Sequence, residues 1–161
     1  MSTPLIIGLM LGVVLALLAL PVLLVVSRLV LRMMVGPLED RIAAHHGPDE
    51  ILMKDLTANS FGRESAGVWQ VRGNGALVLT AECLHFFMFL PRRELRVPLD
   101  AITELTFTRS HLGKATIFDL LKVRFNSEGK SDSIAWYLAD PATWKRRIEE
   151  LGAGAARDRR Q

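Results

Sequence analysis

The first part of the chain carries a long apolar run that gives way to charged sequence. Residues 5–26 contain no charged side chain and are dense in Leu and Val, whereas all 20 Lys and Arg and all 17 Asp and Glu follow them. A helix rises ~1.5 Å per residue, so a run of this length covers roughly the 30 Å hydrocarbon thickness of a bilayer. The sequence therefore predicts a transmembrane anchor over residues 1–35, followed by a polar body.

A secretory signal peptide is the main alternative for this run. Signal peptides have a basic n-region, a short apolar stretch and a cleavage site of small residues. Here no charged side chain precedes the run, and Arg28 and Arg32 follow it in place of an Ala-x-Ala site. A buried core helix would be apolar on one face only, whereas this run is apolar all round. We therefore expect an uncleaved single span, with a kink at Pro21 of the kind that membrane helices tolerate.

The basic residues beside the run predict its orientation. Arg28, Arg32 and Arg41 cluster after the span, whereas the other side offers only the terminal amine. Because Lys and Arg favour the cytoplasmic side, we expect the N-terminus outside and the C-terminal domain in the cytoplasm, at the cell (inner) membrane. Cys83 is the only cysteine, so an internal disulfide is impossible, which fits a reducing compartment.

Small residues recur every four positions in the apolar run, at Gly8, Gly12 and Ala16. This spacing lines one side of a helix and is typical of close helix–helix contact in lipid. It predicts helix association, either as a homodimer or on the helices of a larger partner. The alternative is chance spacing, because Gly and Ala are frequent in membrane helices.

After the anchor, the sequence predicts a juxtamembrane connector and one domain. Pro37 favours an end to the membrane helix and the start of a short helix over residues 38–46, within a connector of residues 36–49. Residues 50–152 are enough for one domain with its own core. Residues 153–161 are predicted to form a disordered tail.

Alternating apolar and polar residues predict seven strands in this domain, with no helix between them. The expected strands are residues 51–60, 76–80, 83–90, 94–99, 104–108, 117–125 and 134–138. In the sixth, Ile117 and Leu121 are expected to share one apolar face. Successive strands without intervening helices favour a mainly antiparallel meander.

A helix is predicted after the last strand. Asp140 suits its N-cap, Gly152 suits its end, and Trp144, Ile148 and Leu151 form one apolar stripe between them. The predicted fold class is therefore mainly β with a C-terminal α-helix. We expect a seven-strand antiparallel barrel or sandwich, preceded by one transmembrane helix.

Three segments resemble pleckstrin-homology-like (PH-like) domains of the GRAM and bacterial PH-like families. Residues 72–86 resemble the "G-x-L-x-L-T…L-x-F" opening of these families, and residues 97–105 resemble their "I-P-L-x-x-I-x-x-V" segment. Residues 140–151 are similar to their closing helix. The resemblance implies a PH-like fold over roughly residues 50–151, and a function in binding lipid headgroups, peptides or partner proteins.

The domain carries no pattern that points to catalysis. It has no nucleophile elbow, triad order or paired acidic motif, and residues 73–75 lack the Lys and following helix of a phosphate loop. Cys83 and His85 share a strand face, but structural zinc takes four ligands, so a core cysteine and a half-buried histidine are the simpler interpretation. A pH sensor is one interpretation of His45 and His46, and a solvated helix end is the simpler one. We predict no enzyme activity, no cofactor and no metal.

The predicted binding surface is the segment after residue 82. Residues 83–90 are apolar on both strand faces, whereas a sheet with one wet face should alternate. Phe86 and Met88 lie on one of these faces. Either this strand meets a partner or the bilayer, or the connector helix or the loop around Trp69 covers it. The basic residues that follow, with the two apolar ones, are the predicted lipid-headgroup or partner contacts: Arg92, Arg93, Arg96, Phe86 and Met88.

Charge limits the class of partner. Lys54 and Arg63 begin a pattern that resembles phosphoinositide-binding PH domains, but Glu64 interrupts it. A net charge of +3 and a pI of about 9.4 fit an anionic membrane and are too mild for nucleic acid. The sequence thus predicts a membrane-anchored cytoplasmic binding module, most simply a protein-interaction or scaffold subunit. The alternative is an anionic lipid-headgroup sensor.

Overall fold

The chain divides into two compact units, Met1–Pro37 and Leu38–Gln161. The computed structural model describes residues 3–67 and 72–158. Within its helices, the side chains of some residues are not described, namely residues 3–9, 11, 13–16, 30–34 and 154–158.

The first helix, α1, runs over Thr3–His45 and includes Pro21 and Pro37. The end predicted at Pro37 is therefore wrong: a proline removes one helical hydrogen bond, which kinks a helix without having to end it. The described large side chains in the apolar run are exposed, for example Leu23 and Val25. Among the residues that the structure describes, no helix reaches the length and apolarity that a membrane crossing requires, so the predicted transmembrane anchor is not supported there.

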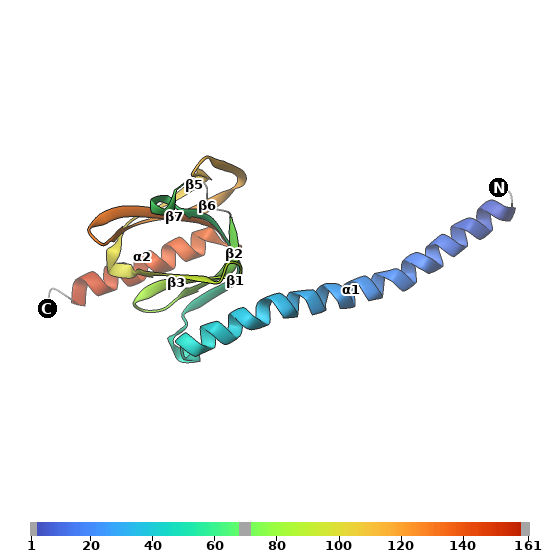
Figure 1. Ribbon diagram of the computed structural model, residues 1–161, viewed down its shortest axis with the longest axis horizontal. Helices are drawn as coiled ribbons and strands as arrows, with labels where there is room; N and C mark the ends of the chain where they lie inside the picture. The colour runs from blue at the N-terminus through green and yellow to red at the C-terminus, as the bar shows by residue number, and fades with distance from the viewer. Residues whose placement is uncertain (1–2, 68–71, 159–161) are drawn as a thin grey trace. The chain divides into compact units, whose positions relative to one another are not determined.

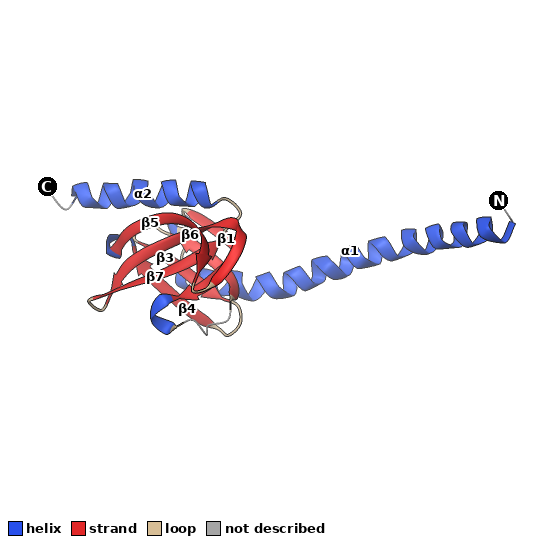
Figure 2. Ribbon diagram, turned by 90° about the horizontal axis from the view of Figure 1, so that it is seen from above, coloured by secondary structure: helices blue, strands red, loops and turns tan. Residues whose placement is uncertain are grey.

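The second unit contains one seven-stranded sheet and a closing helix (Figures 1 and 2). Its strands are β1 Met53–Arg63, β2 Gly73–Leu79, β3 Cys83–Met88, β4 Arg93–Pro98, β5 Ile102–His111, β6 Lys114–Ser127 and β7 Lys130–Tyr137. They pair antiparallel in the order β4-β3-β2-β1-β7-β6-β5. The helix α2, Pro141–Asp158, lies along one side of the strands in Figure 2. The predicted mainly β class with a C-terminal helix is confirmed, and this order fits the PH-like resemblance.

The main core lies between the curved sheet and α2. It contains the inward side chains of six strands around Trp136, together with Trp144 and Ile148 from α2, both buried. Asp140 caps the helix, because its Oδ1 accepts a hydrogen bond from the Thr143 backbone N–H at 3.1 Å. The predicted apolar stripe and N-cap of this helix are therefore confirmed.

The end predicted for this helix is wrong, because α2 continues through Gly152 to Asp158. Gly152 does not adopt the positive φ that lets glycine terminate a helix. Residues 153–158, predicted as disordered tail, are helical, and residues 159–161 lie outside the described residues.

A second apolar cluster explains why β3 is apolar on both faces. Leu38 and Ile42, at the end of α1, are only 4% and 3% exposed and pack against Ala76, Val78 and Phe87 on the outer face of β2 and β3. Residues 38–46, which we call the connector segment, are therefore part of the folded domain. The sequence left open whether a partner, the bilayer, the connector helix or the loop around Trp69 covers the outer face of β3. The structure shows the connector segment packed on this face, and Trp69 lies outside the described residues.

Candidate functional site

A cleft opens where the connector segment ends against β3. Its volume is about 500 Å³. The connector segment, the 3₁₀ turn Pro48–Glu50 and strands β3 and β4 all contribute to its walls, together with the turn between β2 and β3. The polar residues that line it include His46, Glu50, Thr80, Cys83, His85 and Arg96.

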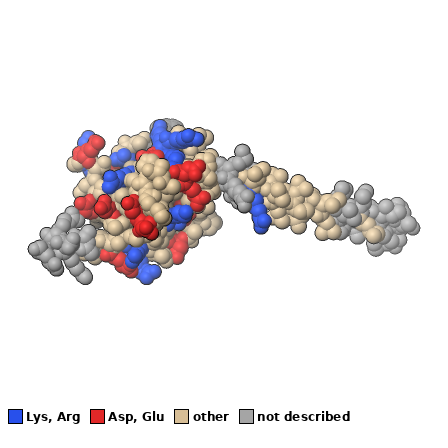
Figure 3. Space-filling view, turned by 90° about the horizontal axis from the view of Figure 1, so that it is seen from below, with Lys and Arg blue, Asp and Glu red and all other residues tan. Residues whose placement is uncertain are grey.

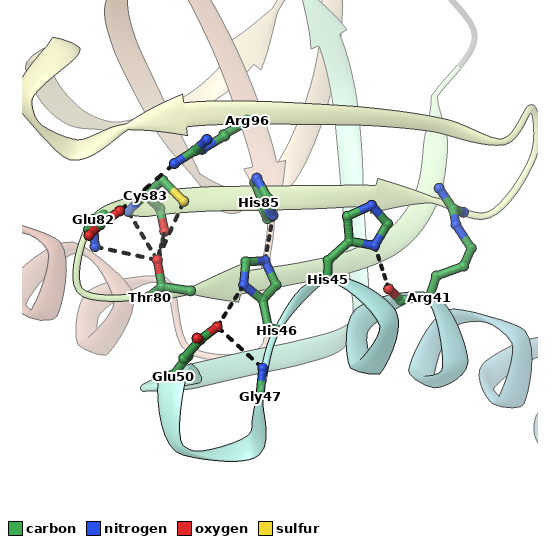
Figure 4. A network of polar contacts seen from close by, with 10 residues as sticks. All are labelled: Arg41, His45, His46, Gly47, Glu50, Thr80, Glu82, Cys83, His85 and Arg96. Carbon is green, nitrogen blue, oxygen red and sulfur yellow. Dashed lines mark hydrogen bonds and ion pairs between the residues drawn. The ribbon is translucent and has the colours of Figure 1, made fainter.

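Two histidines from distant parts of the chain meet in this cleft (Figure 4). His46 Nε2 lies 2.6 Å from His85 Nδ1, so one ring donates its N–H to a lone pair on the other. On the far side of His46, Nδ1 faces a Glu50 carboxylate oxygen at 3.6 Å. A nitrogen that accepts a hydrogen bond is unprotonated, so the pair requires at least one neutral ring.

Burial keeps the His85 ring neutral by lowering its pKa. Burial lowers the pKa of His85 to about 4, and the nearby positive charges of His46 and Arg96 add to the effect. His85 is therefore neutral at pH 7, and the tautomers of the two rings decide which of them donates. The pair joins the connector segment to the middle of β3 by a contact that depends on protonation.

Arg41 joins the same connector segment to the β3–β4 hairpin. Its guanidinium donates to the Met88 carbonyl at 2.8 Å and to a Glu94 carboxylate oxygen at 2.7 Å, and lies 5.6 Å from the centre of the Phe87 ring. The hydrogen bond from Arg41 lowers the pKa of Glu94. His45 Nε2 is 3.3 Å from the other Glu94 oxygen. The connector is thus held by apolar packing, an ion pair and the histidine pair.

The structure separates the predicted contact residues into two groups. Arg92 and Arg93 are exposed at the hairpin, and Arg96 is exposed at the edge of the cleft, 3.9 Å from Glu82. Phe86 is 3% exposed and lies in the main core, so its prediction as a contact is wrong. Met88 is partly buried against the same core.

Phe86 and Met88 lie on the inner face of β3, in the main core, whereas the connector segment covers the outer face of this strand. This alternation places Phe87, which was not predicted as a contact, under Arg41. Sequence analysis also missed the histidine pair, because it interpreted His46 as part of a solvated helix end. The one available signal was that His85 shares a strand face with Phe87, on the apolar outer side that needed a cover.

The structure also places the residues of the phosphoinositide-like pattern. Lys54 Nζ is 3.2 Å from a Glu39 carboxylate oxygen, and Arg63 pairs with the buried Asp132. Both cations therefore already have acidic partners within the domain. Figure 3 shows Lys and Arg interspersed with Asp and Glu on the face that it presents. On this face, and at Lys54 and Arg63, positive charge is therefore not concentrated for an anionic headgroup.

The described residues give no arrangement suited to a metal. No group of three or more His, Cys, Asp or Glu among them is placed to hold an ion. Cys83 is buried, and its Sγ lies 3.4 Å from Thr80 Oγ1. In the predicted helix-association ridge, Gly12 has open space around the position of an added Cβ, whereas the side-chain surroundings of Gly8 and Ala16 lie outside what is described.

Comparison with known proteins gives structural similarity only. No family model and no curated protein matches the chain. The chain is similar to a solved Vps36 N-terminal PH domain, with 14% identity and a TM-score of 0.48 over 66% of this chain and 80% of that one. It is also similar to the C-terminal domain of an unknown protein from Leishmania infantum, with 12% identity and a TM-score of 0.48 over 79% of this chain and 98% of that one.

Proposed function

We propose that this protein is a membrane-anchored binding module whose PH-like domain holds a protein partner on the cytoplasmic side. The observation that carries the proposal is the docking of the connector segment. Leu38, Arg41 and Ile42 make the chain that follows the apolar run an integral part of the domain. The folded domain therefore begins at Leu38, shortly after the apolar run in the sequence.

The anchor itself is proposed from the sequence. Residues 5–26 carry no charge, and the described aliphatic side chains among them, such as Leu17 and Leu18, are exposed to solvent in the isolated chain. Exposed aliphatic surface on this scale is costly in water and favourable in lipid. The basic residues Arg28, Arg32 and Arg41 support a cytoplasmic domain.

A protein partner fits the domain better than a lipid headgroup. Lys54 and Arg63 are paired with acids, which leaves the β3–β4 hairpin as the remaining basic candidate. The alternative function is accordingly an anionic headgroup sensor that uses Arg92, Arg93 and Arg96. These side chains are exposed, and none of the three has an ion pair shorter than 3.9 Å in the described part of the chain.

Vesicle flotation of residues 38–161 separates the two functions. We expect the domain to remain unbound with both neutral phosphatidylcholine vesicles and vesicles enriched in phosphatidylserine. Flotation that follows anionic lipid would favour the sensor instead, provided that Arg92→Gln with Arg93→Gln abolishes it. The matched control is Arg146→Gln with Arg147→Gln, which removes two exposed charges from α2.

Association through the apolar helix is a further part of the proposal. Gly8, Gly12 and Ala16 would form its contact ridge, in a homodimer or against a partner's helices. In a membrane two-hybrid assay of residues 1–35, Gly12→Ile should abolish self-association and Leu11→Ile should preserve it. Absence of self-association in the wild type would eliminate the homodimer.

A further inference from the structure

The turn between β3 and β4 combines an exposed aliphatic side chain with exposed positive charge. Leu90, two positions after the end of β3, is 75% exposed. Arg92 and Arg93 follow it, and both are exposed. We call these three residues the hairpin tip. A single exposed leucine is ordinary on a protein surface, so the significance of Leu90 depends on the charges beside it.

The positive charge of the hairpin tip is not neutralised within the described residues. Neither Arg92 nor Arg93 forms an ion pair there. The acid that follows them in the sequence, Glu94, is engaged elsewhere. One of its carboxylate oxygens accepts a hydrogen bond from Arg41 at 2.7 Å, and the other lies 3.3 Å from His45. Glu94 therefore interacts with the connector segment and leaves the two arginines without an acidic partner.

The register of the hairpin keeps Arg93 and Glu94 on opposite faces. Glu94 pairs with Phe87, on the outer face that the connector segment covers. Arg93 pairs with Met88, on the inner face. Because neighbouring side chains on a strand point to opposite faces, the acid is directed away from the arginine that precedes it. The geometry of β4 thus leaves the charge of Arg93 available to a ligand.

Exposed basic residues elsewhere in the domain show a different arrangement. On α2, Arg147 lies 3.0 Å from Glu150. On the β5–β6 hairpin, Arg109 lies 2.8 Å from Asp119. A protein that approaches either of these surfaces meets mixed charge, whereas one that approaches the hairpin tip meets adjacent arginines. Charge complementarity therefore favours an acidic partner at the tip.

The arginines of the tip suit a protein segment better than a bilayer. Lipid-binding segments gather roughly four to eight Lys or Arg. Arg96, the third arginine predicted as a contact, pairs with His85 on the outer face and lies 3.9 Å from Glu82, so it does not add to the tip. A guanidinium can hold a single carboxylate through two parallel N–H···O hydrogen bonds. Each arginine of the tip can therefore bind one Asp or Glu side chain.

We propose that the hairpin tip binds an acidic segment of the protein partner, with carboxylates on Arg92 and Arg93 and an apolar side chain packed on Leu90. An apolar contact beside charged contacts is the usual composition of a protein–protein interface. The inference rests on the proposed function, since it states the chemistry of the protein partner. Flotation tests the protein-against-lipid choice, and the selection described next tests the chemistry of the segment, so either proposal can fail alone.

The test uses the full chain in non-ionic detergent micelles and a phage-displayed library of random peptides of about twelve residues. We expect the selected peptides to combine Asp or Glu with an aliphatic residue. Arg92→Glu with Arg93→Glu should weaken their binding by about tenfold or more, and should select basic peptides instead. The matched control, Arg146→Glu with Arg147→Glu, reverses two exposed charges on α2 and should leave both binding and selection unchanged.

The contribution of the apolar contact is tested separately from that of the charge. Leu90→Ser keeps both arginines and should weaken peptide binding by about tenfold, the loss expected for one buried aliphatic side chain. The altered side chains are exposed, so these variants are expected to fold. A measurement on the unaltered chain supports the result independently: bound peptide should shift the NMR signals of the Arg92 and Arg93 side chains.

Several outcomes would overturn the proposal. One is a selection that enriches no peptide, or only peptides without Asp or Glu. Another is a set of acidic peptides whose binding neither responds to Arg92→Glu with Arg93→Glu nor shifts the side-chain signals of these arginines. Displacement of the peptides by phosphatidylserine vesicles, but not by phosphatidylcholine vesicles, would assign the hairpin tip to a lipid headgroup instead.

Discussion

His85 can accept a hydrogen bond from His46 only while it is unprotonated. Its surroundings combine partial burial with positive charge from His46 and Arg96, and Glu94 opposes these effects only as the weakest of the causes. Protonation of both rings would set two donors 2.6 Å apart and break the contact. At this position, one proton therefore controls part of the docking of the connector segment.

The lowered pKa of His85 predicts how stability depends on pH. Between its ordinary value of 6.5 and its folded value of about 4, the unfolded chain binds a proton that the folded chain does not. The contribution of neutral His85 to the free energy of unfolding is therefore fully present above pH 6.5 and is lost as the pH falls towards 4. We expect the melting temperature to fall between pH 7.5 and pH 5, and to fall less in His85→Asn.

Other titratable groups, His111 and Glu94, also make the stability of the domain depend on pH. Burial also lowers the pKa of His111, so part of the decline should persist in His85→Asn. The pKa of Glu94 is lowered mainly by Arg41, and this effect adds to the loss at more acidic pH. An identical decline in wild type and His85→Asn would contradict the role given to the histidine pair.

At the scale of elements, the connector segment should be a stabilising part of the domain. Truncation of a buried Ile to Ala typically costs ~2–5 kcal/mol, and Ile42 is 3% exposed. Ile42→Ala should therefore lower the free energy of unfolding of the domain by an amount in this range and increase proteolysis within residues 38–46. Leu29→Ala, in the same helix but exposed, is the control and should leave the domain unchanged.

The closing helix should be held by its apolar stripe. Truncation of a buried Trp to Ala typically costs ~3–5 kcal/mol, a large part of the ~5–15 kcal/mol by which domains are stable. Trp144→Ala should therefore come close to unfolding the domain, as measured by chemical denaturation. Arg146→Ala, at an exposed position of the same helix, should have little effect, and equal effects would mean that the stripe does not dock α2.

Strands such as β4, together with α2, were predictable from sequence because each buries one face, which leaves a local period of two or about four residues. Ile117 shows the limit of this approach: it was predicted on the same face as the buried Leu121, yet it is 82% exposed. Ile117 lies in the β5–β6 hairpin, and the pairing register of this hairpin is irregular between Thr108 and Ser110. The histidine pair was not predictable, because His46 and His85 are 39 positions apart and no local pattern joins them.

At the scale of the whole molecule, orientation in the membrane is the first expectation. Because the basic residues follow the apolar run, we expect the N-terminus outside and the domain inside. In full-length chains whose own cysteine is removed by Cys83→Ser, Ser2→Cys should react with an impermeant thiol reagent on intact cells, and Gln161→Cys should not. The reverse pattern would invert the topology, and a mature chain that starts near Ser27 would restore the signal-peptide alternative.

Photo-crosslinking in native membranes tests the proposal that the domain binds protein at the membrane. A photoreactive residue would replace Arg92 at the exposed hairpin or, as a control, Lys130 at the start of β7, in the full-length chain. We expect a discrete protein adduct from position 92 and none from position 130, identified by mass spectrometry. Adducts to lipid alone from position 92, or the same protein adducts from both positions, would contradict it.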